Sequence, residues 1–111
     1  MNYLLDPTAE IEGTAWAADL EAVPALLIQR FGAPHDRGDQ FKISGRYIFV
    51  DDDHKVFTLY DWKSTSLFDT SLPAPLRFWN SNEVQNFAVG SLDDDAADFK
   101  RWLLERLAES S

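Results

Sequence analysis

The sequence predicts an α+β domain in which a small antiparallel β-sheet of three to four strands has two main helices packed on one face. Residues 41–50 and 56–62 are rich in aromatic and β-branched side chains, as paired strands are. Residues 21–31 and the C-terminal segment instead repeat apolar residues at helical spacing. Because 111 residues that are 45% hydrophobic contain no repeat and no flexible linker, we expect residues 1–111 to form a single acidic domain.

The N-terminal region gives a weak signal before its first helix. Residues 14–19 are too short to be assigned by periodicity, and Pro7 and Gly13 make the preceding segment an irregular arm or a short edge strand.

The first helix is expected over residues 21–31. Pro24 is acceptable there because the first turn needs no hydrogen bond from its nitrogen. Gly32 is the usual residue after a helix C-terminus, and Pro34 prevents continuation.

Residues 41–50 and 56–62 are expected to pair as an antiparallel hairpin across the polar residues 51–55. In the second strand, bulky groups occur at both odd and even positions. One face should therefore pack on the core, and the other should be covered by a helix or be available to a partner.

The C-terminal half is expected to contain a loop over residues 63–72, a helical turn over 76–79, a strand over 84–90 and a final helix ending near residue 108. Ser91 or one of the aspartates at 93–95 should cap that helix. Its apolar stripe consists of Phe99, Trp102, Leu103 and Leu107.

The net charge restricts the classes of partner. Nineteen acidic and ten basic residues give −9 at pH 7 and a pI near 4.4. This charge opposes direct binding to nucleic acid or to anionic membranes and favours a basic protein partner, including a nucleic-acid-binding protein. Acidity that serves solubility alone is the simpler alternative.

Composition also predicts the compartment. The chain has no cysteine, which fits a reducing compartment, and its first residues lack the basic and long apolar segments of a secretory signal. No apolar run approaches the ~20 residues of a membrane span. We therefore expect a cytoplasmic protein.

Local catalytic signatures are missing from the sequence, which has no phosphate-binding glycine loop, nucleophile elbow or zinc-protease motif. We expect neither catalysis nor a cofactor. His54 beside three aspartates suggests a metal site, but the run lacks the ligand spacing of a calcium loop, and consecutive side chains diverge. We interpret it as a solvated turn and expect no metal, and we interpret His35 and the tripeptide at 37–39 as ordinary loop residues.

Ten residues are candidates for partner binding. Two aspartate runs give dense negative charge, only part of which helix capping explains. An aromatic cluster offers large, rigid contact area beside charges, although core packing would also explain its rings. The candidates are Asp51, Asp52, Asp53, Tyr60, Asp61, Trp62, Lys63, Asp93, Asp94 and Asp95.

Three hypotheses follow. The first is a non-catalytic acidic module that docks on a basic protein, as an inhibitor or nucleic-acid mimic of the kind that phages and mobile elements use in counter-defence. The alternative is an assembly module that forms a homodimer or obligate complex through its aromatic strand face. Ranked third is a metal-dependent enzyme using His54 with Asp51, Asp53, Asp61 or Asp69.

Overall fold

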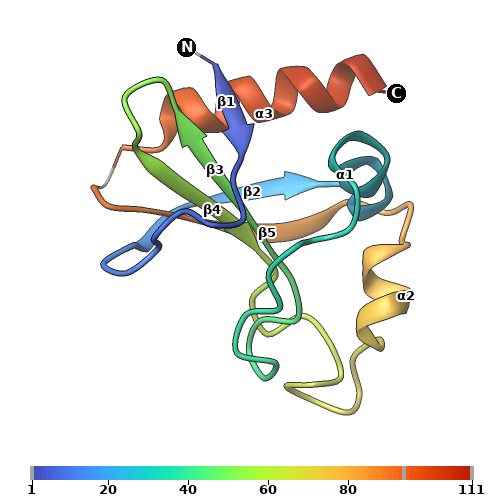
Figure 1. Ribbon diagram of the computed structural model, residues 1–111. Coiled ribbons are helices and arrows are strands. Elements are labelled where there is room, and N and C mark those ends of the chain that lie inside the picture. The colour runs from blue at the N-terminus through green and yellow to red at the C-terminus, as the bar shows by residue number, and fades with distance from the viewer. Residues whose placement is uncertain (1, 94, 111) are drawn as a thin grey trace.

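A five-stranded antiparallel sheet organises the chain (Figure 1). The computed structural model describes residues 2–93 and 95–110, and within them the strands are ordered β1-β3-β4-β5-β2. The elements in chain order are β1 (Tyr3–Leu5), β2 (Ala15–Ala22), α1 (Pro24–Phe31), β3 (Arg46–Asp51), β4 (Val56–Tyr60), α2 (Pro75–Trp79), β5 (Gln85–Ser91) and α3 (Ala97–Ser110). The predicted α+β class is confirmed, with one strand more than the predicted three to four.

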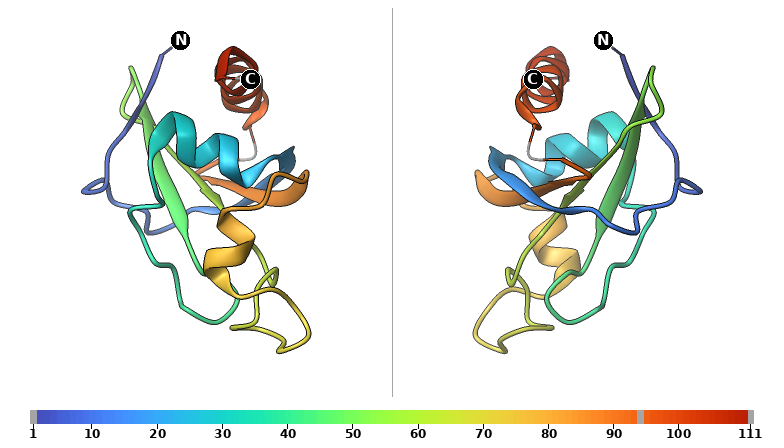
Figure 2. Two further views of the ribbon diagram at one scale, coloured as in Figure 1. Left: turned by 90° about the vertical axis from the view of Figure 1, so that its right-hand side faces the viewer. Right: turned by 90° about the vertical axis from the view of Figure 1, so that its left-hand side faces the viewer.

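Helices α1 and α3 contact each other and cover the same face of the sheet (Figure 2). The short helix α2 packs near one end, where the rings of Phe78 and Trp79 lie 5.7 and 5.5 Å from the ring of Phe87. The prediction of two main helices on one face is therefore confirmed.

The other face of the sheet is only partly covered. Because β1 and β2 lie at opposite edges, residues 6–14 must cross the sheet, and they do so on the side away from α3 (Figure 2). Ile48 and Thr58 are buried although they alternate with the helix-facing residues of their strands. The part of this face around Tyr60 stays open, and we call it the open face.

The predicted hairpin forms as expected. Strands β3 and β4 pair antiparallel, and Val50 lies opposite Val56 at the turn. Phe57 and Leu59 are buried in the core, so the two faces of β4 have the two different environments that the sequence indicates.

The predicted starts of two elements are wrong, and β4 ends at Tyr60 rather than at residue 62. Residues 41–45 form a loop rather than the start of a strand, because Gln40 has a positive φ of 57° and Asp39 Oδ1 accepts hydrogen bonds from the backbone nitrogens of Phe41 and Ile43.

The first helix also starts later than predicted. Residues 21 and 22 end β2, where Ala22 pairs with Gln85 of β5. Pro24 begins the helix, and it holds the preceding Val23 in an extended conformation (φ −89°, ψ 117°). The predicted C-terminus at Gly32 is confirmed by its φ of 80° and by its N–H, which donates to Ile28 O over 2.8 Å.

The core is centred on Phe99 of α3. Its ring lies 5.2 Å from the Tyr3 ring, 5.2 Å from Phe49 and 5.0 Å from Phe57, with the last pair stacked. The predicted stripe is confirmed, since Phe99, Leu103 and Leu107 are buried and Trp102 packs against the core. One ring thus joins α3 to three neighbouring strands.

Truncating this ring should remove much of the stability of the domain. We expect Phe99→Ala to lower the free energy of unfolding by about 3–5 kcal/mol, since it leaves a cavity among three aromatic rings. Leu104→Ala, on the exposed side of the same helix, should cost less than about 1 kcal/mol. Urea unfolding measures both; equal losses would show that α3 does not pack through Phe99.

Candidate functional site

The first aspartate run forms the turn of the β3–β4 hairpin. Asp51 is buried, and its Oδ1 accepts hydrogen bonds from the backbone nitrogens of Asp53 (2.8 Å) and Lys55 (2.9 Å). Asp52 and Asp53 are exposed. Asp51 therefore builds the turn, while the two following carboxylates face solvent.

The second run precedes α3. Asp95 Oδ1 accepts a hydrogen bond from Ala97 N (3.3 Å), and Asp93 Oδ1 accepts one from Asp95 N (3.0 Å). The predicted capping role thus belongs in part to Asp95, while Ser91 Oγ donates to the carbonyl of Asp93 instead. Asp94 lies outside the described residues.

The fold brings the two runs together. Lys55 of the hairpin lies 3.7 Å from Asp93, measured from Nζ to Oδ2. A depression of about 100 Å³ between the hairpin turn and the start of α3 is lined by Tyr3, Asp51, Asp53, Lys55, Phe57, Asp95, Asp98 and Phe99. We call the exposed carboxylates of Asp52, Asp53, Asp93, Asp95 and Asp98 the acidic end.

The pKa of the Tyr3 hydroxyl responds to the negative charge at the acidic end. Burial raises the pKa of its hydroxyl, and the charges of Asp98, Asp51, Asp95 and Asp52 raise it further. Carboxylates from both runs therefore act on a single atom of β1, because negative charge nearby disfavours the phenolate.

The aromatic cluster lies on the open face, away from the acidic end. Tyr60 is half-buried and Trp62 is 45% exposed, and their rings are 6.2 Å apart at 73°. The ammonium groups of Lys42 and Lys63 lie 5.7 and 5.6 Å from the centre of the Trp62 ring. These cation–π contacts hold a large ring at the surface.

Asp61 has a structural role between these two aromatic residues. It is fully buried and accepts hydrogen bonds from Ser44 N (2.9 Å), Ser44 Oγ (2.9 Å) and Gly45 N (2.9 Å). Burial raises the pKa of its carboxyl, and these bonds oppose that rise. Asp61 therefore fixes the loop before β3 and does not offer its carboxylate to a partner.

Trp16, Asp19 and Asn86 lie beside the aromatic cluster, although they are not among the residues predicted from the sequence. They line a depression of about 390 Å³ with Tyr60, Trp62 and Ala88. The sequence pattern of β2 indicates this site only weakly, because a register shift between Trp16 and Ala18 interrupts the alternation of side chains between the two faces of the strand.

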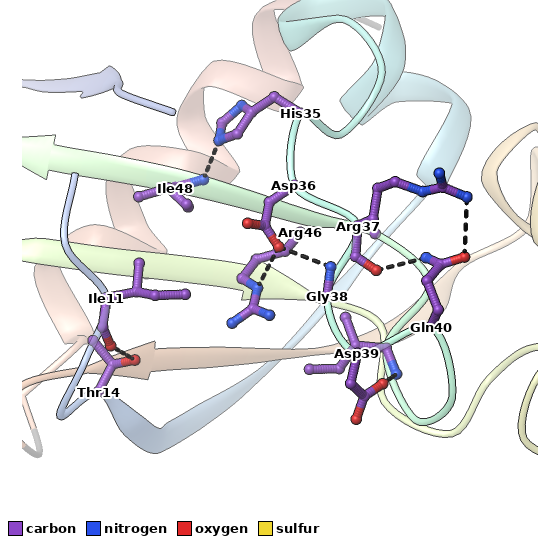
Figure 3. Close-up of polar contacts among 12 residues, drawn as sticks. Ile11, Thr14, His35, Asp36, Arg37, Gly38, Asp39, Gln40, Arg46 and Ile48 are labelled. Atoms are coloured by element: carbon purple, nitrogen blue, oxygen red, sulfur yellow. Dashed lines mark hydrogen bonds and ion pairs between the residues drawn. The ribbon is translucent and has the colours of Figure 1, made fainter. Parts of the chain in front are cut away.

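The loop before β3 is built by local polar contacts (Figure 3). His35 Nε2 accepts a hydrogen bond from Ile48 N (3.0 Å), and Asp36 Oδ1 lies 3.1 Å from Arg46 Nε. The tripeptide at 37–39 forms part of the turn, where Gly38 N donates to Asp36 Oδ1 (2.8 Å). His35 thus has a backbone partner that its loop position did not indicate.

The described residues contain no group of three or more His, Asp or Glu side chains arranged to hold a metal ion. Within the same part of the chain, none of the helices has the length and apolar character needed to cross a membrane. A comparison with protein-family models gives no match, and neither does a search of curated proteins. The geometry of the molecule is therefore the basis for assigning a function.

Removing the Asp61 carboxylate should destabilise the domain. Asp61→Ala leaves the buried N–H groups of the loop without an acceptor, and we expect it to lower the free energy of unfolding by about 1–3 kcal/mol. Asp69→Ala is the matched control, because Asp69 accepts a backbone hydrogen bond from Ser71 in an exposed turn. Chemical denaturation should show a clearly larger loss for Asp61; equal losses would contradict the structural role.

His35 should make stability depend on pH. Burial lowers the pKa of its imidazole from 6.5, and Nε2 must be unprotonated to accept the bond from Ile48. Below pH 6.5 the unfolded chain therefore binds a proton that the folded chain resists, so stability falls as the pH decreases towards the folded-state pKa.

This contribution can be isolated by comparing thermal melts of the wild type and His35→Gln from pH 7.5 to 5. The wild type should lose more stability over this range, by at most about 1 kcal/mol, because the ring is partly solvated. Parallel pH profiles for the two proteins would contradict the assignment.

Proposed function

We propose that this protein is a non-catalytic binding module whose acidic end docks on the basic surface of another protein. The observation that supports the proposal best is that the hairpin turn and the start of α3, separated by about forty residues of sequence, both contribute exposed aspartates to one depression, namely Asp53 from the first and Asp95 and Asp98 from the second. Charges spaced over two rigid elements present a fixed pattern to a partner, and complementary charge accelerates encounter.

The counter-charges at the acidic end are weakly held. Lys55 pairs with Asp93 and Arg101 pairs with Asp98, and all four side chains are more than half exposed. Such surface ion pairs contribute little free energy. A partner's lysines and arginines can therefore replace them at small cost and relieve the repulsion between neighbouring carboxylates.

A basic surface that accepts this pattern is typical of nucleic-acid-binding proteins, which neutralise rows of phosphates. We accordingly propose an inhibitor or nucleic-acid mimic that acts in the cytoplasm, of the kind that a phage or mobile element uses in counter-defence. Direct contact with nucleic acid or membrane stays disfavoured by the net charge of −9.

The alternative, assembly through the aromatic strand face, is supported by the exposure of Trp16 and Trp62 on the open face. It uses a surface distinct from the acidic end. Substitutions at the two surfaces therefore separate the two functions.

Neutralising the exposed hairpin aspartates should weaken capture of the partner. The double variant Asp52→Asn with Asp53→Asn leaves the buried turn-forming Asp51 intact, so folding should be unchanged. In an affinity pull-down from the source cell, we expect wild type to retain a basic protein at low salt and to release it at high salt. The double variant should associate at least about threefold more slowly at low salt and show a shallower dependence on ionic strength.

Glu12→Gln with Glu83→Gln is the matched control, since it removes the same charge from two exposed positions elsewhere. Equal association rates and salt slopes for the two double variants would contradict docking through the acidic end. Capture of the chain itself as the sole retained species would support the assembly alternative instead.

A further inference from the structure

The open face contains a depression lined by aromatic rings and by one carboxylate. Trp16 and Trp62 are 60% and 45% exposed, and they line it together with Asp19, Tyr60, Asn86 and Ala88. Asp19 pairs with Ala88 across β2 and β5, and Ala88 pairs with Tyr60 across β5 and β4. These three side chains therefore form one row on one side of the sheet.

Small residues of β5 keep the floor of this depression low. Ala88 lies between Asp19 and Tyr60, and Gly90 is the next residue of β5 on that side. A Cβ on Gly90 would lie 2.6 Å from Thr58 Oγ1 and 3.6 Å from Tyr60 Cε1. Since larger side chains on this strand would fill the space beside Tyr60, the hollow depends on its small residues.

The depression contains hydrogen-bond acceptors that have capacity to spare. Asp19 Oδ1 accepts a hydrogen bond from Trp16 Nε1 (3.0 Å), which positions both side chains. Within residues 2–93 and 95–110, Asp19 Oδ2, the Tyr60 hydroxyl and the Asn86 side chain have no hydrogen-bonded partner, and all three residues line the depression. Among the described lining residues, Asp19 is the one side chain charged at neutral pH.

The surroundings are compatible with a cation. The Trp62 ring already attracts Lys42 and Lys63, although neither lysine lines the depression. Arg46 lies opposite Tyr60 on β3, and its charge acts on the Tyr60 hydroxyl, but its guanidinium is also paired with Asp36. Aromatic rings and a carboxylate oxygen without a hydrogen-bond donor, as in Asp19, both favour positive charge.

We infer that this depression is a binding site for an arginine side chain of a partner protein. A guanidinium group is planar, so it can stack on a tryptophan, and its five N–H donors can reach the separate acceptors of Asp19, Tyr60 and Asn86. An ammonium group has three donors and no plane to stack. The site uses none of the residues of the acidic end, so it stands or fails independently of the docking proposed above.

The test uses the isolated protein and a small probe, N-acetyl-arginine methylamide. Titration into ¹⁵N-labelled protein should shift the indole N–H signals of Trp16 and Trp62. The signals of Trp79 and Trp102 should stay in place, because Trp79 Nε1 donates to Ser44 Oγ and Trp102 packs against Tyr3. The corresponding lysine derivative should bind more weakly, and adenosine monophosphate should cause no shift.

Asp19→Asn should reduce the affinity for the probe about tenfold, since it removes a charge-assisted hydrogen bond while the amide oxygen can still accept from Trp16. Trp62→Ala provides a second, independent loss of at least about twofold. Glu12→Gln, which removes one exposed charge elsewhere, should leave the affinity unchanged. Thermal melts verify that each variant is folded.

Several results would overturn the inference. These are equal probe affinities for wild type, Asp19→Asn and Trp62→Ala, shifts of all four indoles together, or stronger shifts with adenosine monophosphate than with the arginine derivative. The last result would assign the depression to a stacked nucleobase.

Discussion

The packing of Phe99 against the aromatic rings of β1, β3 and β4 is the contact on which the arrangement of this molecule depends. It fixes the first turns of α3 over one edge of the sheet, beside the hairpin turn. The aspartates before α3 thereby come to lie next to those of the hairpin. A hydrophobic contact thus determines where the negative charge gathers, because the burial of aromatic area outweighs the modest repulsion between exposed carboxylates.

The two aspartate runs show that residues of one type can have different roles in one fold. Asp51 and Asp61 are buried and serve as acceptors for backbone N–H groups, so they stabilise turns. Asp52 and Asp53, in contrast, are exposed to solvent. The net charge therefore overstates the negative charge that a partner can contact. The exposed carboxylates of the two runs are clustered at one end of the molecule.

The acidic end and the aromatic depression provide different kinds of recognition. Exposed carboxylates act over a Debye length and mainly affect the rate of encounter. An aromatic depression with one carboxylate acts at contact distance and selects the shape and hydrogen bonding of a single group. A basic protein that used both surfaces would be attracted by the first and identified by the second.

The sequence determined the local elements whose signals lie within a few residues: the β3–β4 hairpin, the end of α1 at Gly32 and the apolar stripe of α3. Each follows from side-chain periodicity or from a glycine conformation, which need no distant partner. It did not determine strand β2, since that strand is defined by its pairing with β5 and its alternation is interrupted by a register shift.

The tertiary structure alone decided which candidates share a surface. It joined the two aspartate runs at one end, buried Asp61 in a loop, and placed Trp16 and Asp19 beside Tyr60 and Trp62. These results depend on strand order and on the packing of α3, which bring together residues that lie tens of positions apart. Local sequence patterns contain no information about such distances, because the free energy that fixes them comes from burial between elements rather than within them.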